Sequence, residues 1–157
     1  MSGQTTAKEN SMWSVGYEIE VDTGWRAKAV RAHNVTCAGR KELRLERSRS
    51  GGTVNGRHRP ELSDCKDVDF ESSAVTNTVP IHRIEFVVGV PVDVPAVFVR
   101  AEDLRVERLE QQYTLTEVTG EGLAFHYSSS TFEFNCELQF DAAGLIVDYP
   151  GIAARDS

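Results

Sequence analysis

Apolar and polar residues alternate along most of the chain, which is the pattern of β-strands that are buried on one face. The clearest case is 131–141, a segment that ends at a turn over 141–144. Leu145, Val147 and Tyr149 then resume the alternation. The segment 131–141 has five apolar residues on one face: Phe132, Phe134, Cys136, Leu138 and Phe140. These features predict a C-terminal β-hairpin.

The same pattern predicts a second hairpin closer to the N-terminus. Tyr17, Ile19 and Val21 alternate with acidic residues, and 22–24 contains the Asp-Thr-Gly sequence of a turn. The strand that follows is expected to start at Trp25.

Several weaker signals extend the β pattern. Leu43 and Leu45 mark a strand before a turn region at 50–56, and 84–88 alternates as another strand would. The segment 104–115 is compatible with two short strands or with a short helix. A helical turn is expected at 71–80, where Ser72 or Ser73 are candidate N-caps and Pro80 is the expected end.

These elements predict a mainly β fold, a closed or strongly curled antiparallel sheet with little helix. Its single domain is expected over 15–155, and the polar segment 1–14 is expected to be a disordered tail. Such a sheet encloses either a packed core or a ligand cavity. The apolar residues expected to point inward are Phe86, Val97, Val99, Phe125, Phe132, Phe134 and Phe140.

Composition narrows the class of protein. The 157 residues carry a formal net charge of −7, which argues against a general nucleic-acid binder. The basic residues between 40 and 49 are interrupted by Glu42 and Glu46 and lack interleaved aromatics, so we interpret them as a solvated strand face.

The sequence also bears on the compartment in which the protein resides. The first residues lack the features of a secretory signal, no apolar run could cross a bilayer, and three widely spaced cysteines fit reduced thiols. We therefore expect a cytoplasmic protein without a transmembrane segment. The pattern predicts no metal and no cofactor, and it leaves the oligomeric state open.

The segment 62–86 is unusual because it places charged and polar groups among apolar residues. In an extended chain Asp67 and Asp69 project from one face, and two such close carboxylates need compensation. Arg83 is the best partner because a guanidinium can hold a carboxylate through two hydrogen bonds, and His82 could add another. We favour such a structural network over a ligand site or a hard-cation site, which would need oxygens from 76–78.

The other candidate residues have a structural and a binding interpretation each. Thr76 and Asn77 either satisfy backbone groups of a turn or present a hydroxyl and an amide to a ligand. For two further pairs of residues we favour the structural interpretation over the binding one, since a buried tyrosine hydroxyl needs a hydrogen-bonding partner. These pairs are Gln111 with Tyr113, and Asp148 with Tyr149.

Several spaced blocks resemble a bacterial domain family described as putative glycolipid-binding. The resemblance covers about 17–155 and implies a spiral β-roll, in which a long antiparallel sheet wraps around one helix. The blocks are Leu62, Cys65, Asp67-Val68-Asp69, Thr76-Asn77-Thr78, Pro80-Ile81, Arg83, Gln111, Tyr113, Gly144-Leu145 and Asp148-Tyr149-Pro150-Gly151.

Two departures from the family stand out. No strand or hairpin is expected before Tyr17, which would leave an unpaired edge at 17–22. His82 stands where a second arginine is more usual, which would make the local charge dependent on pH.

The resemblance implies binding of a glycolipid or another amphipathic small molecule in the interior of the roll. Two alternatives remain open. A hydrolase would use Asp67, Asp69 and His82 as acid and base, and an adaptor would offer an exposed sheet edge to a partner strand. No nucleophile elbow, phosphate loop or zinc-protease motif occurs, so an enzyme is the less favoured class.

Overall fold

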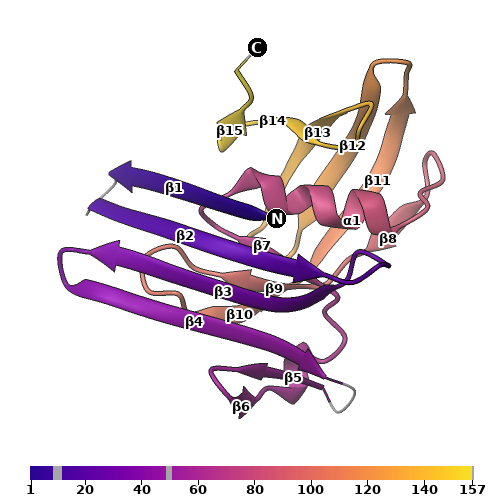
Figure 1. Ribbon diagram of the computed structural model, residues 1–157. Coiled ribbons are helices and arrows are strands. Elements are labelled where there is room, and N and C mark those ends of the chain that lie inside the picture. The colour runs from indigo at the N-terminus through magenta and orange to yellow at the C-terminus, as the bar shows by residue number, and fades with distance from the viewer. Residues whose placement is uncertain (9–11, 49–50, 157) are drawn as a thin grey trace.

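The computed structural model describes residues 1–8, 12–48 and 51–156, and within them the strands form three sheets. The first sheet is an antiparallel meander in chain order (Figure 1). Its strands are β1 (Ser2–Lys8), β2 (Met12–Val21), β3 (Ala27–Thr36), β4 (Gly39–Ser48), β5 (Gly51–Val54) and β6 (Arg57–His58).

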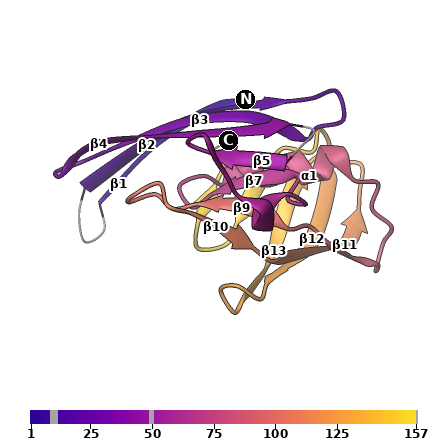
Figure 2. The ribbon, with the colours of Figure 1, turned by 90° about the horizontal axis from the view of Figure 1, so that it is seen from below.

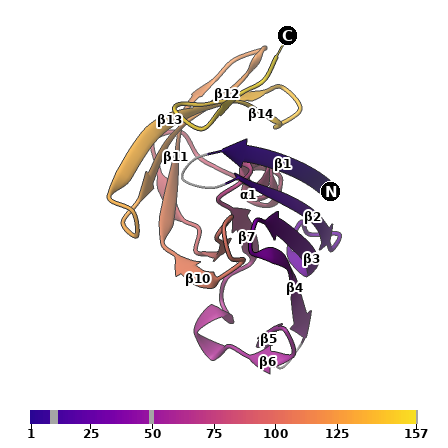
Figure 3. The same cartoon turned by 90° about the vertical axis from the view of Figure 1, so that its left-hand side faces the viewer.

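The second sheet is small and lies between the other two in the view of Figure 3. It has the order β10 (Val106–Leu109), β9 (Ala96–Val99) and β7 (Asp67–Phe70), and β7 pairs with β9 in parallel. A parallel pair needs a crossover connection, and the chain between β7 and β9 includes the helical segments and β8.

The third sheet is antiparallel and has a linear order from β15 to β8. Its strands are β15 (Ala153–Ala154), β14 (Ile146–Tyr149), β13 (Phe134–Asp141), β12 (Gly122–Ser129), β11 (Gln111–Val118) and β8 (Pro91–Asp93). The sheets are curled and open, as Figure 2 shows from below. The fold is therefore mainly β, as predicted.

The helical segments are short. A 3-10 turn η1 covers Pro60–Leu62, a second turn η2 covers Ala74–Asn77, and α1 follows directly over Thr78–Arg83. Pro80 lies inside the first turn of α1, so the prediction that the helix ends there was wrong. The physical reason is that backbone N–H groups in a first helical turn have no intrahelical acceptor, so proline costs little there.

Two apolar clusters fill most of the space between the layers. One joins the inner face of the first sheet to β7 and β9, where Tyr17 stacks on Phe70 with ring centroids 4.5 Å apart. The other lies under the third sheet and includes Tyr113 and Phe125. Strand β7 lies between the two clusters. Val68 and Phe70 belong to the first cluster, so Asp67 and Asp69, which alternate with them, face the opposite side.

Both predicted hairpins are confirmed, since β2 pairs with β3 and β13 pairs with β14. The expected strand start at Trp25 was wrong, because Trp25 lies in the turn with a φ of +58° and β3 begins at Ala27. The segment 104–115 contains two strands, β10 and the start of β11, rather than a helix. The predicted strand at 84–88 was wrong. Those residues form an unpaired connection in which Ile84 and Phe86 pack on the core while Val87 and Val88 are exposed.

The expected disordered tail over 1–14 and the unpaired edge at 17–22 were also wrong. Strand β1 pairs with β2 from Ser2 opposite Glu18 to Lys8 opposite Met12, so the N-terminal hairpin is present. Its inward positions carry small residues, Gly3, Thr5 and Ala7, and backbone pairing rather than apolar burial holds the strand. Residues 9–11 of the predicted tail lie outside the described residues.

The basic residues of 40–49 behave as a solvated strand face where they are described. On β4, Arg40 contacts Glu42 at 3.2 Å and Arg44 contacts Glu46 at 2.7 Å, with all four side chains about half exposed or more. Arg49 lies outside the described residues.

Candidate functional site

The core of the polar network is an ion pair between β7 and α1. Arg83 donates to both carboxylate oxygens of Asp67, through Nε to Oδ1 at 3.2 Å and through Nη2 to Oδ2. The Asp67 side chain is 2% exposed and that of Arg83 is 13% exposed. Burial raises the pKa of Asp67, and the guanidinium acts against this by stabilising the carboxylate.

Asp69 has a different environment two residues further along the same face of β7. It has no arginine partner among its described contacts, and the hydroxyl of Thr76 lies 2.5 Å from its Oδ1. Burial raises the pKa of Asp69 to about 6, while Thr76 and the N–H of Phe70 partly offset this by hydrogen bonding. Asp69 therefore takes up a proton at a mildly acidic pH.

Thr76 links this carboxyl group to the backbone. Its hydroxyl oxygen also lies 2.8 Å from the carbonyl oxygen of Ser73. One hydroxyl has one proton, so it cannot donate to both acceptors at once. When Asp69 is protonated, it can donate to Thr76, which then donates to Ser73. The geometry fits the protonated acid.

A buried amide extends the network toward the third sheet. Asn77 donates to the carbonyl of Ala74 at 3.1 Å, and the hydroxyl of Tyr113 donates to Asn77 Oδ1 at 2.6 Å. Gln111 accepts instead from Tyr127 at 3.0 Å. Asn77, Gln111 and Tyr113 are all buried, so these bonds satisfy groups that would otherwise be desolvated without partners.

Two of the sequence-predicted residues lie apart from this network. His82 is exposed on α1 and stacks on Trp25, with ring centroids 4.1 Å apart and planes 13° apart. Asp148 is half-buried on β14, and no side-chain hydrogen bond of the described residues links it to the aspartates of β7. Asp67, Asp69 and His82 therefore do not form the exposed acid and base group that a hydrolase of this kind would need.

The Trp25 and His82 stack connects the turn between β2 and β3 to α1, and it allows a first test. Replacing Trp25→Ala removes the ring contact but keeps a side chain at a backbone φ of +58°. We expect the free energy of unfolding to fall by about 1 kcal/mol, the usual value of an aromatic pair. Chemical denaturation of both proteins measures this, and equal midpoints would show that the stack contributes nothing.

A pocket of about 280 Å³ opens where β7, η2 and the third sheet meet. Asp69 and Asn77 contribute to its lining from the network described above. The other lining residues are mainly aromatic or apolar: Phe70, Ala74, Phe98, Tyr127, Phe132, Phe134, Tyr149 and Ile152, together with Glu71, Ser73 and Arg100. We call this space the aromatic pocket. It joins residues from β7, η2, β9, β12, β13 and β14.

Two of its residues were misplaced by the sequence analysis. Phe132 and Phe134 were expected in the core, but each is 37% exposed. Phe132 lies in a turn that precedes β13, next to Glu133 with a φ of +51°. The turn shifts the start of the strand to Phe134, so the alternation predicted for 131–133 does not continue inward.

Arg100 closes one side of the aromatic pocket. Its guanidinium lies 5.1 Å from the ring centroid of Phe98 and 4.9 Å from that of Phe132. It also contacts Glu107 at 2.6 Å and Glu71 at 2.9 Å. The cation is thus held by two carboxylates and two rings, and it places a fixed positive group at the pocket wall.

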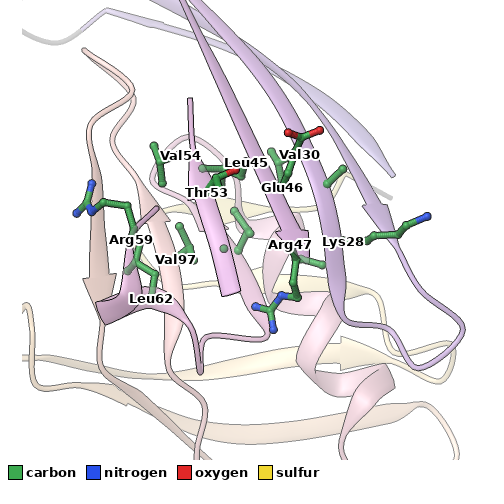
Figure 4. Close-up of a pocket in the computed structure, with 14 residues that line it drawn as sticks. Lys28, Val30, Leu45, Glu46, Arg47, Thr53, Val54, Arg59, Leu62 and Val97 are labelled. Carbon is green, nitrogen blue, oxygen red and sulfur yellow. The ribbon is translucent and has the colours of Figure 1, made fainter. Parts of the chain in front are cut away.

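Another space, shown in Figure 4, is too small to hold an organic ligand. It lies between β3, β4, β5 and η1 and has a volume of about 40 Å³. Val30, Leu45 and Val97 line it with apolar surface. Ligand pockets usually enclose several hundred Å³, so we interpret this space as a gap in the core of the first sheet.

Within the described residues, no group of three or more His, Cys, Asp or Glu side chains could hold a metal ion. The two candidate ligands of a hard cation already have partners: Asp67 pairs with Arg83, and Asp69 is hydrogen-bonded to Thr76. Nor does any described helix have the length and apolar character to cross a membrane.

The fold and pocket define a class: a curled, open β-fold with an aromatic pocket between its layers. The sequence profile of the family described as "Putative glycolipid-binding" matches residues 1–155, so the chain belongs to that family. The match includes β1, which the resemblance over 17–155 had left out.

A solved structure has the same fold. The crystal structure of a DUF1089 family protein from Pseudomonas aeruginosa superposes with a TM-score of 0.82 at 23% identity, covering 98% of this chain and 91% of that one. At this identity the likeness establishes the fold alone. A search of curated proteins found no match.

Proposed function

We propose that this protein binds an amphipathic small molecule such as a glycolipid, with the polar head group in the aromatic pocket. The observation that carries this proposal is the lining of the pocket, in which aromatic rings, two of them exposed, accompany a carboxyl group and an amide. Small-molecule sites commonly combine a mainly apolar wall with a few well-placed polar groups.

The chemistry of the pocket suits a sugar-like head group. The C–H face of a sugar ring packs on aromatic side chains such as Phe134 and Tyr149, and its hydroxyl groups need hydrogen-bonding partners. Among the hydrogen bonds of the described residues, none uses Oδ2 of Asp69, which leaves this atom as an acceptor for a hydroxyl. Arg100 supplies donors at the opposite wall, although its carboxylate partners compete for them.

The family description supports the same class of ligand. The enzyme alternative loses support because Asp67 is engaged in an ion pair and His82 stacks on Trp25 away from the carboxylates. An adaptor would use an exposed sheet edge and would need no internal cavity. The aromatic pocket therefore favours a small ligand over a partner strand.

Titration with octyl β-glucoside below its micelle concentration tests the proposal. We expect Phe134→Ser to weaken binding about tenfold, because it removes most of one aromatic contact surface from the ligand. Isothermal titration calorimetry gives both dissociation constants. Val118→Ser, at a 57% exposed position on β11 outside the pocket lining, is the matched control and should bind like the wild type.

A second measurement identifies a natural ligand. Native mass spectrometry of the protein purified from its own host, followed by organic extraction, is expected to reveal a stoichiometric amphipathic molecule. A clean apo mass, together with no uptake of alkyl glucosides by the wild type, would overturn the proposed function.

A further inference from the structure

A second and larger hollow adjoins the aromatic pocket. It has a volume of about 600 Å³ and lies between β1 and the strands β14 and β15. Figures 1 and 3 show β14 near β1. We call it the β1 groove. Glu71, Ser73, Ala74 and Ile152 line both spaces, so the two are adjacent.

The β1 groove exists because the inward residues of β1 are small. Gly3, Thr5 and Ala7 line it, whereas the neighbouring strand β2 contributes the large rings of Trp13 and Tyr17. Larger side chains on β1 would fill the space between the two sheets. At Gly3 the space is taken by the ring of Tyr17, since a Cβ atom there would lie 2.5 Å from the Tyr17 hydroxyl oxygen, so the groove itself depends on Thr5 and Ala7.

The groove offers little to a charged ligand. Among the described residues that line it, only Glu71 and Arg155 are charged, and each is paired: Glu71 with Arg100 at 2.9 Å and Arg155 with Asp141 at 2.8 Å. The polar groups of Thr5 and Tyr17 are also engaged, with the Ser72 carbonyl and the Ser73 hydroxyl. Ser2 and Gln4 also line the groove but belong to the exposed positions of β1, so apolar contact is the main interaction available at its inward residues.

One polar group at the boundary lacks a partner. Ser72 lines the groove between Glu71 and Ser73, which line both spaces, and it is only 8% exposed. Its Oγ has no hydrogen-bond partner within the described part of the chain. A buried hydroxyl without a partner costs free energy, and because its oxygen is closed to solvent it offers the groove no accessible polar group.

We infer that the β1 groove takes the hydrocarbon chain of the same ligand, so that the ligand is a chain-bearing amphiphile. This inference rests on the proposed function. The head group occupies the aromatic pocket, and the chain follows β1 past Trp13. The four lining residues that the two spaces share place them side by side, which argues for one molecule that occupies both.

A series of alkyl β-glucosides from methyl to octyl, all below their micelle concentrations, separates the two parts of the site. For the wild type we expect affinity to rise about three- to fourfold with each methylene group that enters the groove. In Ala7→Phe, which fills the groove, this dependence on chain length should disappear while methyl β-glucoside binds as before. Thr6→Phe is the matched control, because Thr6 is exposed on the opposite face of β1.

Fluorescence gives a readout that does not depend on the folding of a groove variant. The chain has two tryptophans, so Trp25→Phe leaves Trp13 as the sole emitter. An octyl β-glucoside brominated at the chain end should quench Trp13, which lines the groove. Head-group binding with no chain-length dependence and no quenching would overturn this inference and leave the proposed function intact. Failure of every glucoside to bind would overturn both.

Discussion

Replacing Arg83→Ala should lower the free energy of unfolding by about 3 kcal/mol at neutral pH, because it leaves Asp67 buried without its cation. Arg83 is the only partner that holds both oxygens of this carboxylate among the described hydrogen bonds. With a side chain only 2% exposed, Asp67 cannot regain water without local opening of β7. Urea denaturation of both proteins provides the measurement.

The pH dependence of the Arg83→Ala variant follows from the same contact. Burial already raises the pKa of Asp67, and loss of the guanidinium raises it further. A group whose pKa is higher in the folded than in the unfolded state favours folding at low pH and disfavours it as the pH rises. The loss of unfolding free energy in Arg83→Ala, relative to the wild type, should therefore become smaller as the pH is lowered.

Two controls separate this effect from a general loss of surface charge. Arg155→Ala breaks an exposed ion pair with Asp141 and should cost less than about 1 kcal/mol. The double variant Arg83→Met with Asp67→Leu should recover much of the loss, since apolar residues can replace a buried pair. If Arg83→Ala is as stable as Arg155→Ala, the ion pair does not hold β7 to α1.

The sequence predicted strands well where one face of the strand is buried against large side chains. In β2 the apolar alternation of Tyr17, Ile19 and Val21 was strong, and the hairpin with β3 is present. In β1 the inward residues are Gly3, Thr5 and Ala7, which give no apolar signal, and the strand depends on backbone pairing with β2. The segment 84–88 shows the converse, since it alternates but remains unpaired.

Some contacts of the candidate site could likewise be predicted from the sequence, and others could not. The contact between Arg83 and Asp67 could be predicted because charge and bidentate geometry leave few alternatives. The contact of Asp69 with Thr76 depends on how η2 folds back on β7, which residue types do not encode. The aromatic pocket was missed because the turn at 131–133 takes Phe132 out of the strand and Phe134 lies at the very start of β13, where each ring is 37% exposed.

Replacing Asp69→Asn should stabilise the protein above pH 6 and leave its stability nearly unchanged near pH 3. Burial raises the pKa of Asp69 from 3.8 to about 6, so the folded protein holds a proton there that the unfolded chain has released. Wild-type stability then falls as the pH rises from about 4 to about 6, by about 3 kcal/mol in total. Asparagine cannot ionise and avoids this loss.

The substitution also fits the hydrogen bonds around Asp69. An asparagine NH₂ group can donate to Thr76, as the protonated acid does, so that Thr76 still donates to Ser73. The second N–H of the amide needs a partner of its own, which reduces the gain to about 1–3 kcal/mol at pH 8. Asp93→Asn, at an exposed position on β8, is the matched control and should follow the wild-type pH profile.

Denaturation at a series of pH values between 3 and 8 tests this directly. The difference in unfolding free energy between Asp69→Asn and the wild type should grow through the window from about pH 4 to 6 and then stay constant. Parallel profiles would mean that Asp69 titrates alike in the folded and unfolded states. Because Asp69 also lines the aromatic pocket, a growing difference would identify a carboxyl group that the fold keeps at a cost in stability, as expected for a group retained for binding rather than for folding.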